Sequence, residues 1–127
     1  MKINYDCIRD VLIYLENTLC YDELLRCSAV NLEELCASIL NYSKQDIYYS
    51  LLMLSEAGFI TARAVNSDNR AIDFICYRLT FEGHRYLDSV KSPQIWKEIK
   101  ETFKSKALEL SVDGVLALAK KLIFDRL

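Results

Sequence analysis

Residues 43–79 read SKQDIYYSLLMLSEAGFITARAVNSDNRAIDFICYRL, and this stretch decides the fold. Ser43 can cap a helix over residues 44–57, and Gly58 is placed to end that helix in the left-handed conformation. The pattern then changes to two runs rich in β-branched and aromatic residues, joined by a polar turn sequence: residues 59–66, 67–70 and 71–79. The stretch therefore predicts a helix followed by a β-hairpin.

The residues upstream of this stretch predict two more helices. Asn4 is placed to cap a helix over residues 5–17, in which apolar residues recur at helical spacing: Ile8, Val11, Leu12 and Leu15. Asn31 can cap a short second helix over residues 32–40, with Glu34 as its capping-box partner. The stretch between these two helices has no clear assignment. Three helices and then a hairpin is the order of a winged helix, in which the third helix recognises DNA and the hairpin is the wing.

Residues 80–127 predict three further helices, each preceded by a residue whose side chain can cap it: Thr80, Ser92 and Ser111. Pro93 fits the first position of its helix, where its missing N–H costs nothing. We therefore expect a mainly α protein with a β-hairpin wing, in the α+β class. A winged helix-turn-helix domain would span residues 1–90, and residues 91–127 would form a C-terminal helical extension, packed on that domain or used for dimerisation.

The bulk composition is that of one globular domain, with 52% hydrophobic and 27% charged residues in a chain of 127. No stretch approaches the roughly 20 apolar residues of a membrane span, and the N-terminus lacks the features of a signal peptide, which favours a cytoplasmic protein. The five cysteines are odd in number, none is spaced like a zinc ligand pair, and the chain has a single His. We expect reduced cysteines, no metal site and no cofactor.

Charge is distributed unevenly along the chain. Residues 1–90 carry eight basic and thirteen acidic residues, whereas residues 91–127 carry eight basic and five acidic residues. A polyanionic partner would therefore meet an acidic N-terminal body and a basic C-terminal tail.

Four stretches carry a resemblance to a known group of proteins: residues 8–12 (IRDVL), 54–60 (LSEAGFI), 79–88 (LTFEGHRYLD) and 95–97 (IWK). In these the chain resembles an uncharacterised winged-helix family of bacteria and their phages, the YjcQ-like group, and a related domain of unknown function. The resemblance implies a winged-helix fold and an origin in a bacterium or prophage. It implies no catalytic residues, because the family has no established activity.

His84 is the one side chain that ordinarily titrates near neutral pH. Asp88 lies four residues later and thus on the same helical face, but no nucleophile accompanies the pair. We interpret His84 as a residue of the helix surface, and Gly83 beside it as a site of close packing against the sheet. With no constellation of acid, base and nucleophile, the sequence indicates a protein that is not an enzyme.

Nucleic-acid binding is the first hypothesis for function, as expected of a phage or bacterial transcription regulator. The third helix, the wing tip and a lysine stripe on the fifth helix supply the candidate residues: Lys44, Gln45, Tyr49, Arg70, Lys97, Lys100 and Lys104. The third helix holds no Arg. Acidic residues reduce the positive charge of the third helix and of the wing: Asp46, Glu56, Asp68 and Asp73.

The second hypothesis is an adaptor or phage host-takeover protein that docks on another protein. Tyr49 and Met53 would face outward from the third helix, and both residue types are enriched in protein interfaces. The last helix is broadly apolar, which suits packing on the domain as well as homodimerisation. The sequence leaves DNA and protein open as partners.

Overall fold

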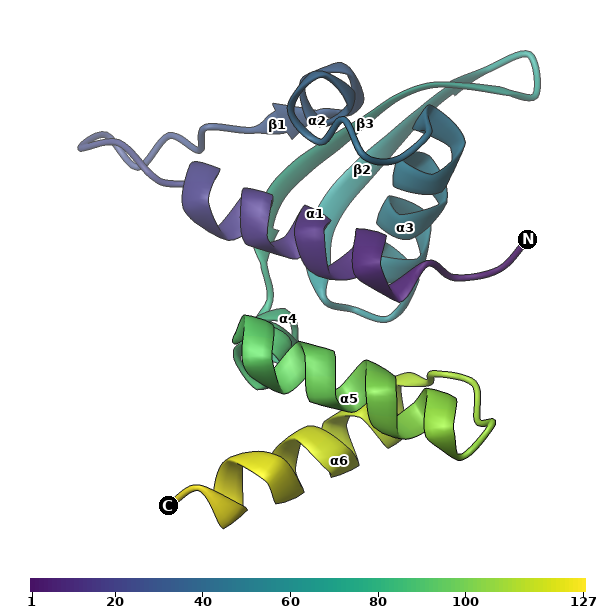
Figure 1. The fold of residues 1–127 in the computed structure, drawn as a ribbon. Coiled ribbons are helices and arrows are strands. Elements are labelled where there is room, and N and C mark those ends of the chain that lie inside the picture. Colours follow the sequence, from purple (N-terminus) through teal and green to yellow (C-terminus); the bar gives the residue numbers. More distant parts are fainter. The chain divides into compact units, whose positions relative to one another are not determined.

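The computed structural model describes residues 1–127, which form two compact units, Met1–His84 and Arg85–Leu127 (Figure 1). Each unit is described by itself. The helices and strands follow in the order α1 (Tyr5–Thr18), β1 (Val30–Asn31), α2 (Leu32–Ser38), α3 (Lys44–Glu56), β2 (Ile60–Ser67), β3 (Arg70–Leu79), α4 (Phe81–Val90), α5 (Pro93–Ser105) and α6 (Val112–Asp125). The chain is thus a mixed α+β protein, as predicted, with six helices and one small sheet.

The sheet of the first unit has three antiparallel strands in the order β1-β3-β2. β2 and β3 form the predicted hairpin. β1 pairs with the other edge of β3, with Val30 opposite Cys76 and Asn31 opposite Ile75. The sequence pattern did not predict β1, because two residues are too few to show the alternation that marks a strand.

The hairpin closes in a tighter turn than its sequence suggested. Ser67 and Arg70 face each other as the last strand pair, so only Asp68 and Asn69 form the loop. Both loop residues have positive φ, 51° and 63°, which is the geometry of a type I′ turn. Asp and Asn tolerate this left-handed region better than other non-glycine residues, and their turn matches the twist of the two strands.

Every N-cap that the sequence predicted is present in the structure. In each case the capping side chain accepts a hydrogen bond from a backbone N–H of the first helical turn: Asn4, Asn31, Ser43, Thr80, Ser92 and Ser111. Glu34 does not complete the predicted capping box. Its carboxylate accepts a hydrogen bond of 2.9 Å from the Tyr14 hydroxyl of α1 instead, which ties α2 to α1.

The sequence predicted the C-terminal end of α3 better than that of α2. α3 ends one residue early, and Gly58 has the expected left-handed conformation with φ of 75°. α2 ends at Ser38 rather than at residue 40, because Ile39 already leaves the helical region. Ile39 is buried while Leu40 is 80% exposed, so burial of the Ile39 side chain takes precedence over helix continuation.

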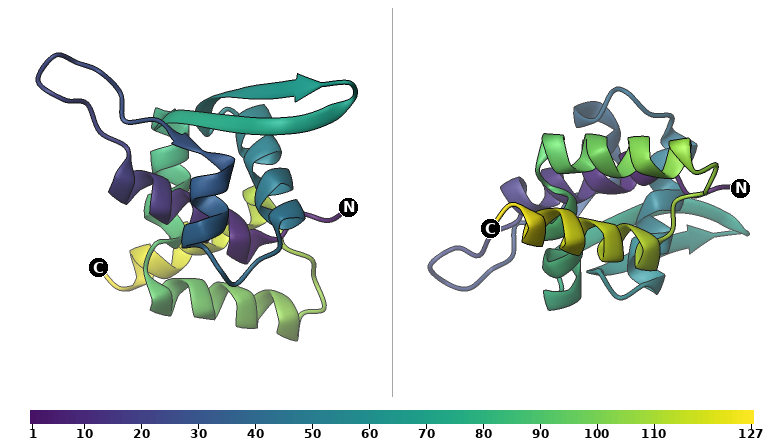
Figure 2. Two further views of the ribbon diagram at one scale, coloured as in Figure 1. Left: turned by 90° about the horizontal axis from the view of Figure 1, so that it is seen from above. Right: turned by 60° about the horizontal axis from the view of Figure 1, so that its bottom comes forward.

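Helices α1, α2 and α3 lie on one face of the sheet, as the two views from the front and from above show (Figures 1 and 2). The apolar faces of these helices and of β3 enclose the core of the first unit. Its side chains have no more than 2% of their surface exposed: Val11, Leu12, Leu15, Leu35, Ile47, Leu51, Leu54, Phe74 and Cys76. Burial of this apolar surface is the main driving force for the arrangement.

Gly83, in the first turn of α4, is a point of close backbone approach. A Cβ at this position would lie 2.0 Å from the carbonyl oxygen of Phe59, which precedes β2. Thr80 fixes the same junction, because its hydroxyl donates to the Gly58 carbonyl and accepts from the Gly83 N–H. The interpretation of Gly83 as a packing residue is therefore confirmed.

In the second unit, α5 and α6 run side by side in opposite directions (Figure 2). Phe103 of α5 packs against Gly114 of α6, where a Cβ would come within 2.9 Å of the ring. Arg126 donates to the Glu98 carboxylate and closes the far end of the pair. No helix of the chain is both long and apolar enough to cross a membrane.

Candidate nucleic-acid and protein-contact surfaces

The first turn of α3 presents two of the predicted binding residues to solvent. Lys44 and Gln45 are exposed directly after the Ser43 cap, whose hydroxyl accepts from the Asp46 N–H at 3.1 Å. Tyr49 and Met53 follow one and two turns later and are half-buried rather than fully outward-facing. The end of α3 closest to its cap is therefore the part most open to a partner.

The hairpin carries another predicted binding residue, Arg70. Arg70 is exposed, but it is the first residue of β3 rather than part of a loose tip. The Tyr48 ring of α3 meets the Phe74 ring of β3 edge to face, with centroids 6.0 Å apart. Tyr48 and the turn residues enclose a shallow polar hollow of about 570 Å³. The structure thus joins α3 and the hairpin tip into one continuous surface.

The basic residues of α3 and the hairpin are distinguished by the partners that they lack, although Arg78 lies apart from the hairpin tip, beside a hollow that Leu15 also lines. Of the seven basic side chains in the first unit, the four on α3 and the hairpin make neither a hydrogen bond nor an ion pair: Lys44, Arg63, Arg70 and Arg78. The other three are engaged elsewhere; Arg9 lies 3.6 Å from Asp10 and Arg26 lies 2.7 Å from Asp22.

Asp73 does not dilute the charge of the wing in the way its sequence position suggested. Its carboxylate accepts from the backbone N–H of Leu32 at 3.2 Å and from that of Phe74 at 2.7 Å. Leu32 is the first residue of α2, so the negative charge is held at the positive end of a helix. Asp73 is a structural residue that links β3 to α2.

The predicted lysine stripe of α5 lies in the second unit, apart from the α3 and hairpin residues in the division of the chain. Lys97 and Lys104 are exposed and make no ion pair. Lys100 is half-buried, with its ammonium 5.8 Å from the centroid of the Trp96 ring. Lys100 is therefore engaged in a cation–π contact, and the free part of the stripe is Lys97 and Lys104.

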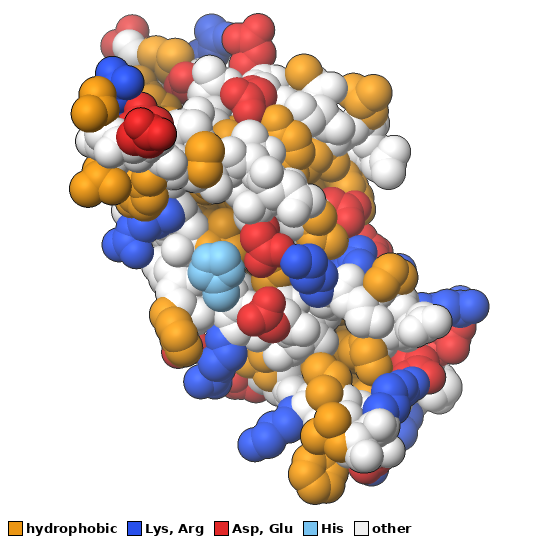
Figure 3. Space-filling view, turned by 90° about the vertical axis from the view of Figure 1, so that its left-hand side faces the viewer, with side chains coloured by type: hydrophobic (Ala, Val, Ile, Leu, Met, Phe, Trp, Pro, Cys, Tyr) orange, Lys and Arg blue, Asp and Glu red, His pale blue; other side chains and the backbone are white.

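His84 has a partner that the sequence did not reveal. Its Nδ1 lies 3.5 Å from a carboxylate oxygen of Glu16 in α1, whereas the sequence pointed to Asp88. The imidazole is half-exposed and forms the pale-blue patch in Figure 3. It borders a hollow of about 240 Å³ together with Leu15, Leu79 and Arg78. Only the fold brings these residues together, so no local sequence pattern could predict this contact or the hollow.

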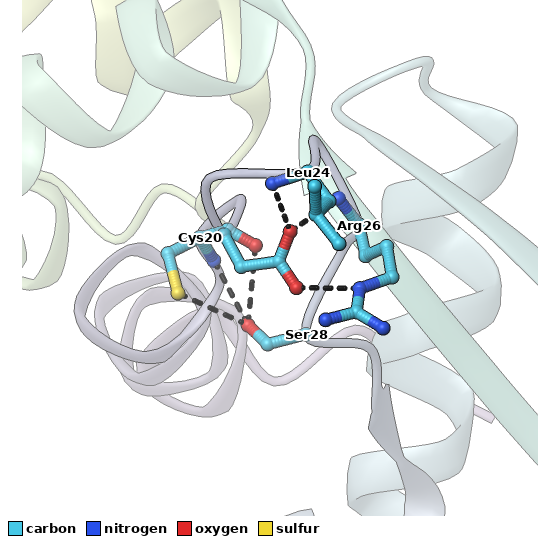
Figure 4. Close-up of polar contacts among 5 residues, drawn as sticks. Cys20, Leu24, Arg26 and Ser28 are labelled. Carbon is cyan, nitrogen blue, oxygen red and sulfur yellow. Dashed lines mark hydrogen bonds and ion pairs between the residues drawn. The ribbon is translucent and has the colours of Figure 1, made fainter.

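The segment between α1 and β1, which has no clear assignment from its sequence, is a hydrogen-bonded loop with exposed leucines. We call residues 20–28 the leucine loop. The Asp22 carboxylate holds it together by accepting from the backbone N–H groups of Leu24 and Arg26, both at 2.9 Å, and from the Arg26 guanidinium at 2.7 Å (Figure 4). At the base of the loop the Ser28 hydroxyl accepts a hydrogen bond from the Cys20 N–H and donates one to the Cys20 carbonyl.

The leucine loop exposes three large side chains that are close together in the sequence. Tyr21 is 57% exposed, Leu24 73% and Leu25 79%. The loop extends from the side of the unit that faces the viewer in Figure 3, where hydrophobic side chains gather at the upper left among charged ones. The sequence analysis missed this surface because the segment has neither helical nor alternating periodicity.

Comparison with known proteins matches the chain to one protein family and to one relative. A family model described as "Hypothetical protein (DUF2513)" matches residues 2–109. An "Uncharacterized protein" of Haemophilus influenzae (strain Rd) is 31% identical over 127 residues, which cover all of this chain and 99% of that protein. No solved structure matches significantly. The expectation of an uncharacterised domain family is confirmed, and the chain belongs to the DUF2513 family of hypothetical proteins.

Proposed function

We propose that this chain is a winged-helix protein without enzymatic activity that binds nucleic acid, as a regulator of bacterial or phage origin. Two features support the winged-helix assignment. The first unit has the element order α1-β1-α2-α3-β2-β3, and its hairpin contacts α3 through the rings of Phe74 and Tyr48. In such domains the third helix enters the major groove and the hairpin contacts the adjacent backbone.

The observation that carries the proposal is the set of unpaired cations on α3 and the hairpin. The first unit is acidic overall, so a basic side chain could readily find a carboxylate partner. Lys44, Arg63, Arg70 and Arg78 nevertheless remain without one. Phosphate groups are the ligands that such cations bind, and Gln45 beside Lys44 has the amide that pairs with adenine. Lys97 and Lys104 would add phosphate contacts from the second unit.

The test is a titration of fluorescence anisotropy with random duplex DNA at a series of salt concentrations. Binding should tighten as salt falls, because each phosphate contact releases counterions. Lys44→Ala, Arg70→Ala and Lys97→Ala should each weaken binding and reduce the log–log salt slope by about 0.9. Lys2→Ala is the matched control, since it removes one exposed positive charge outside this surface. Absence of binding at about 50 mM salt would refute the proposal.

A second candidate is an adaptor that binds a protein through α3. The acidic first unit favours it, and so do Tyr49 and Met53, which retain partial exposure on the same helix. Tyr49→Ala or Met53→Ala should then abolish capture of the partner without lowering the melting temperature. Loss of stability in either variant would instead assign the side chain to the core.

A further inference from the structure

The leucine loop has an arrangement that is unfavourable for an isolated chain. Leu24 and Leu25 are largely exposed, so neither gains the free energy of apolar burial. Leu25 also has φ of 62°, a left-handed conformation that glycine and asparagine adopt far more readily than leucine. Strained backbone combined with solvent-facing apolar surface indicates that the loop makes a contact with another surface.

The loop is also ordered before any contact is made. Asp22 accepts three hydrogen bonds from within the loop, and the Asp22 N–H donates to the Arg26 carbonyl at 3.0 Å. At its base, Tyr21 and Cys27 form an antiparallel bridge, and the Cys27 thiol donates to the Tyr77 carbonyl of β3 at 2.9 Å. A preorganised loop loses little conformational entropy on binding.

The second unit carries a surface of the complementary kind. A groove of about 280 Å³ lies between α5 and α6, with an apolar lining that includes Phe103, Leu108 and Leu118. An apolar cavity of about 150 Å³ accepts a benzene-sized guest, so the groove has room for leucine side chains. Lys106 and Lys121 stand at the groove, and neither makes an ion pair. The groove therefore suits an apolar segment with an acidic neighbour.

We propose that the leucine loop of one copy of this chain binds in the α5–α6 groove of a second copy. Leu24 and Leu25 would enter the groove. Glu23 precedes them in sequence, is exposed and has no ion-pair partner, which matches the two unpaired lysines. Such a contact is heterologous, because two different surfaces of the chain meet in it. It is independent of nucleic-acid binding by α3 and the hairpin.

The charges of the loop argue against a membrane as the occupant. Asp22 and Arg26 neutralise each other, which leaves the Glu23 carboxylate next to the leucines. Anionic lipid headgroups would repel it, whereas membrane-binding segments are enriched in Lys and Arg. The groove, in turn, would be left without an occupant.

The experiment is analytical ultracentrifugation of the full chain over a range of concentrations up to about 1 mM, so that a dissociation constant in the millimolar range is still detected. The mean mass of the wild type should rise with concentration. Leu25→Asp in the loop and Leu108→Asp in the groove should each raise the dissociation constant more than tenfold. Leu40→Asp is the matched control, because Leu40 is as exposed as Leu25 but lies outside both surfaces. The three substituted side chains, Leu25, Leu108 and Leu40, are all exposed, so the variants should fold.

Two mixtures make the test specific for this pairing. Leu25→Asp keeps an intact groove and Leu108→Asp an intact loop, so an equimolar mixture should associate although neither variant does alone. Glu23→Lys should weaken self-association, and adding Lys121→Glu should restore it. A wild type that stays monomeric up to about 1 mM, or a mixture that stays monomeric, would overturn the proposal. Binding of the wild type to lipid vesicles without self-association would overturn it as well.

Discussion

Replacement of Gly83 by Ala tests the junction between the hairpin and α4. The new Cβ would lie 2.0 Å from the carbonyl oxygen of Phe59, whereas ordinary van der Waals contact begins at 3.4 Å. The obstacle is backbone, so no side-chain rotation can relieve the clash. The same carbonyl accepts a hydrogen bond of 2.9 Å from the Thr80 N–H, so displacement of Phe59 also weakens this bond.

The expected loss of stability follows from three contributions. Overpacking costs about 1–3 kcal/mol, and loss of the Thr80 hydrogen bond costs about 1 kcal/mol. Alanine stabilises a helix by up to about 1 kcal/mol relative to glycine. The clash prevails, with a net decrease of about 2 kcal/mol in the free energy of unfolding and a fall of roughly 6–10 °C in Tm for a chain of this size.

Urea denaturation followed by circular dichroism measures this change, with Gly114→Ala as the control. At Gly114 the new Cβ meets two side-chain atoms at 2.9 Å, the end of the Phe103 ring and the Ser111 hydroxyl, and both belong to side chains that can turn. The control should therefore lose less than about 1 kcal/mol, because it gains the same helix propensity. A Gly83→Ala variant as stable as the wild type would refute the close approach of Gly83 to Phe59.

Two further predictions concern the leucine loop and the cysteines. Leu25→Gly should raise the free energy of unfolding by about 0.5–1 kcal/mol, since relief of the left-handed strain exceeds the entropy cost of glycine. Leu24→Gly removes an equally exposed side chain without such relief and should lower it; the reverse order in thermal melts would contradict this account. Burial raises the pKa of the Cys76 thiol from 9.0 to about 12, so its contribution to stability is complete below pH 9 and is lost as pH rises towards 12. Iodoacetamide followed by mass spectrometry should accordingly modify exposed Cys20 well before Cys76, and equal rates would show that Cys76 is not buried.

The sequence predicted the exposure of several candidate binding residues but not the contacts that their neighbours make. Sequence position alone put Lys44 and Gln45 on the exposed start of α3 and Arg70 next to the turn. The engagement of Lys100 with Trp96 depends on the rotamers and packing of α5, which helical spacing does not specify. The sequence likewise suggested that Asp73 is a free charge on the wing, whereas in the fold its carboxylate accepts a hydrogen bond from the first residue of α2.

The sequence by itself determined the helices with their caps, the end of α3 at Gly58, and the hairpin. These features depend on residues within three or four positions of one another, so the local sequence contains the whole signal. The tertiary structure decided the pairing of β1 with β3, the contact of His84 with Glu16, and the contact of the leucine loop with β3. All three join residues far apart in the chain. In the loop the Cys27 thiol donates to the Tyr77 carbonyl of β3, and no periodicity in the sequence encodes such a contact between distant segments.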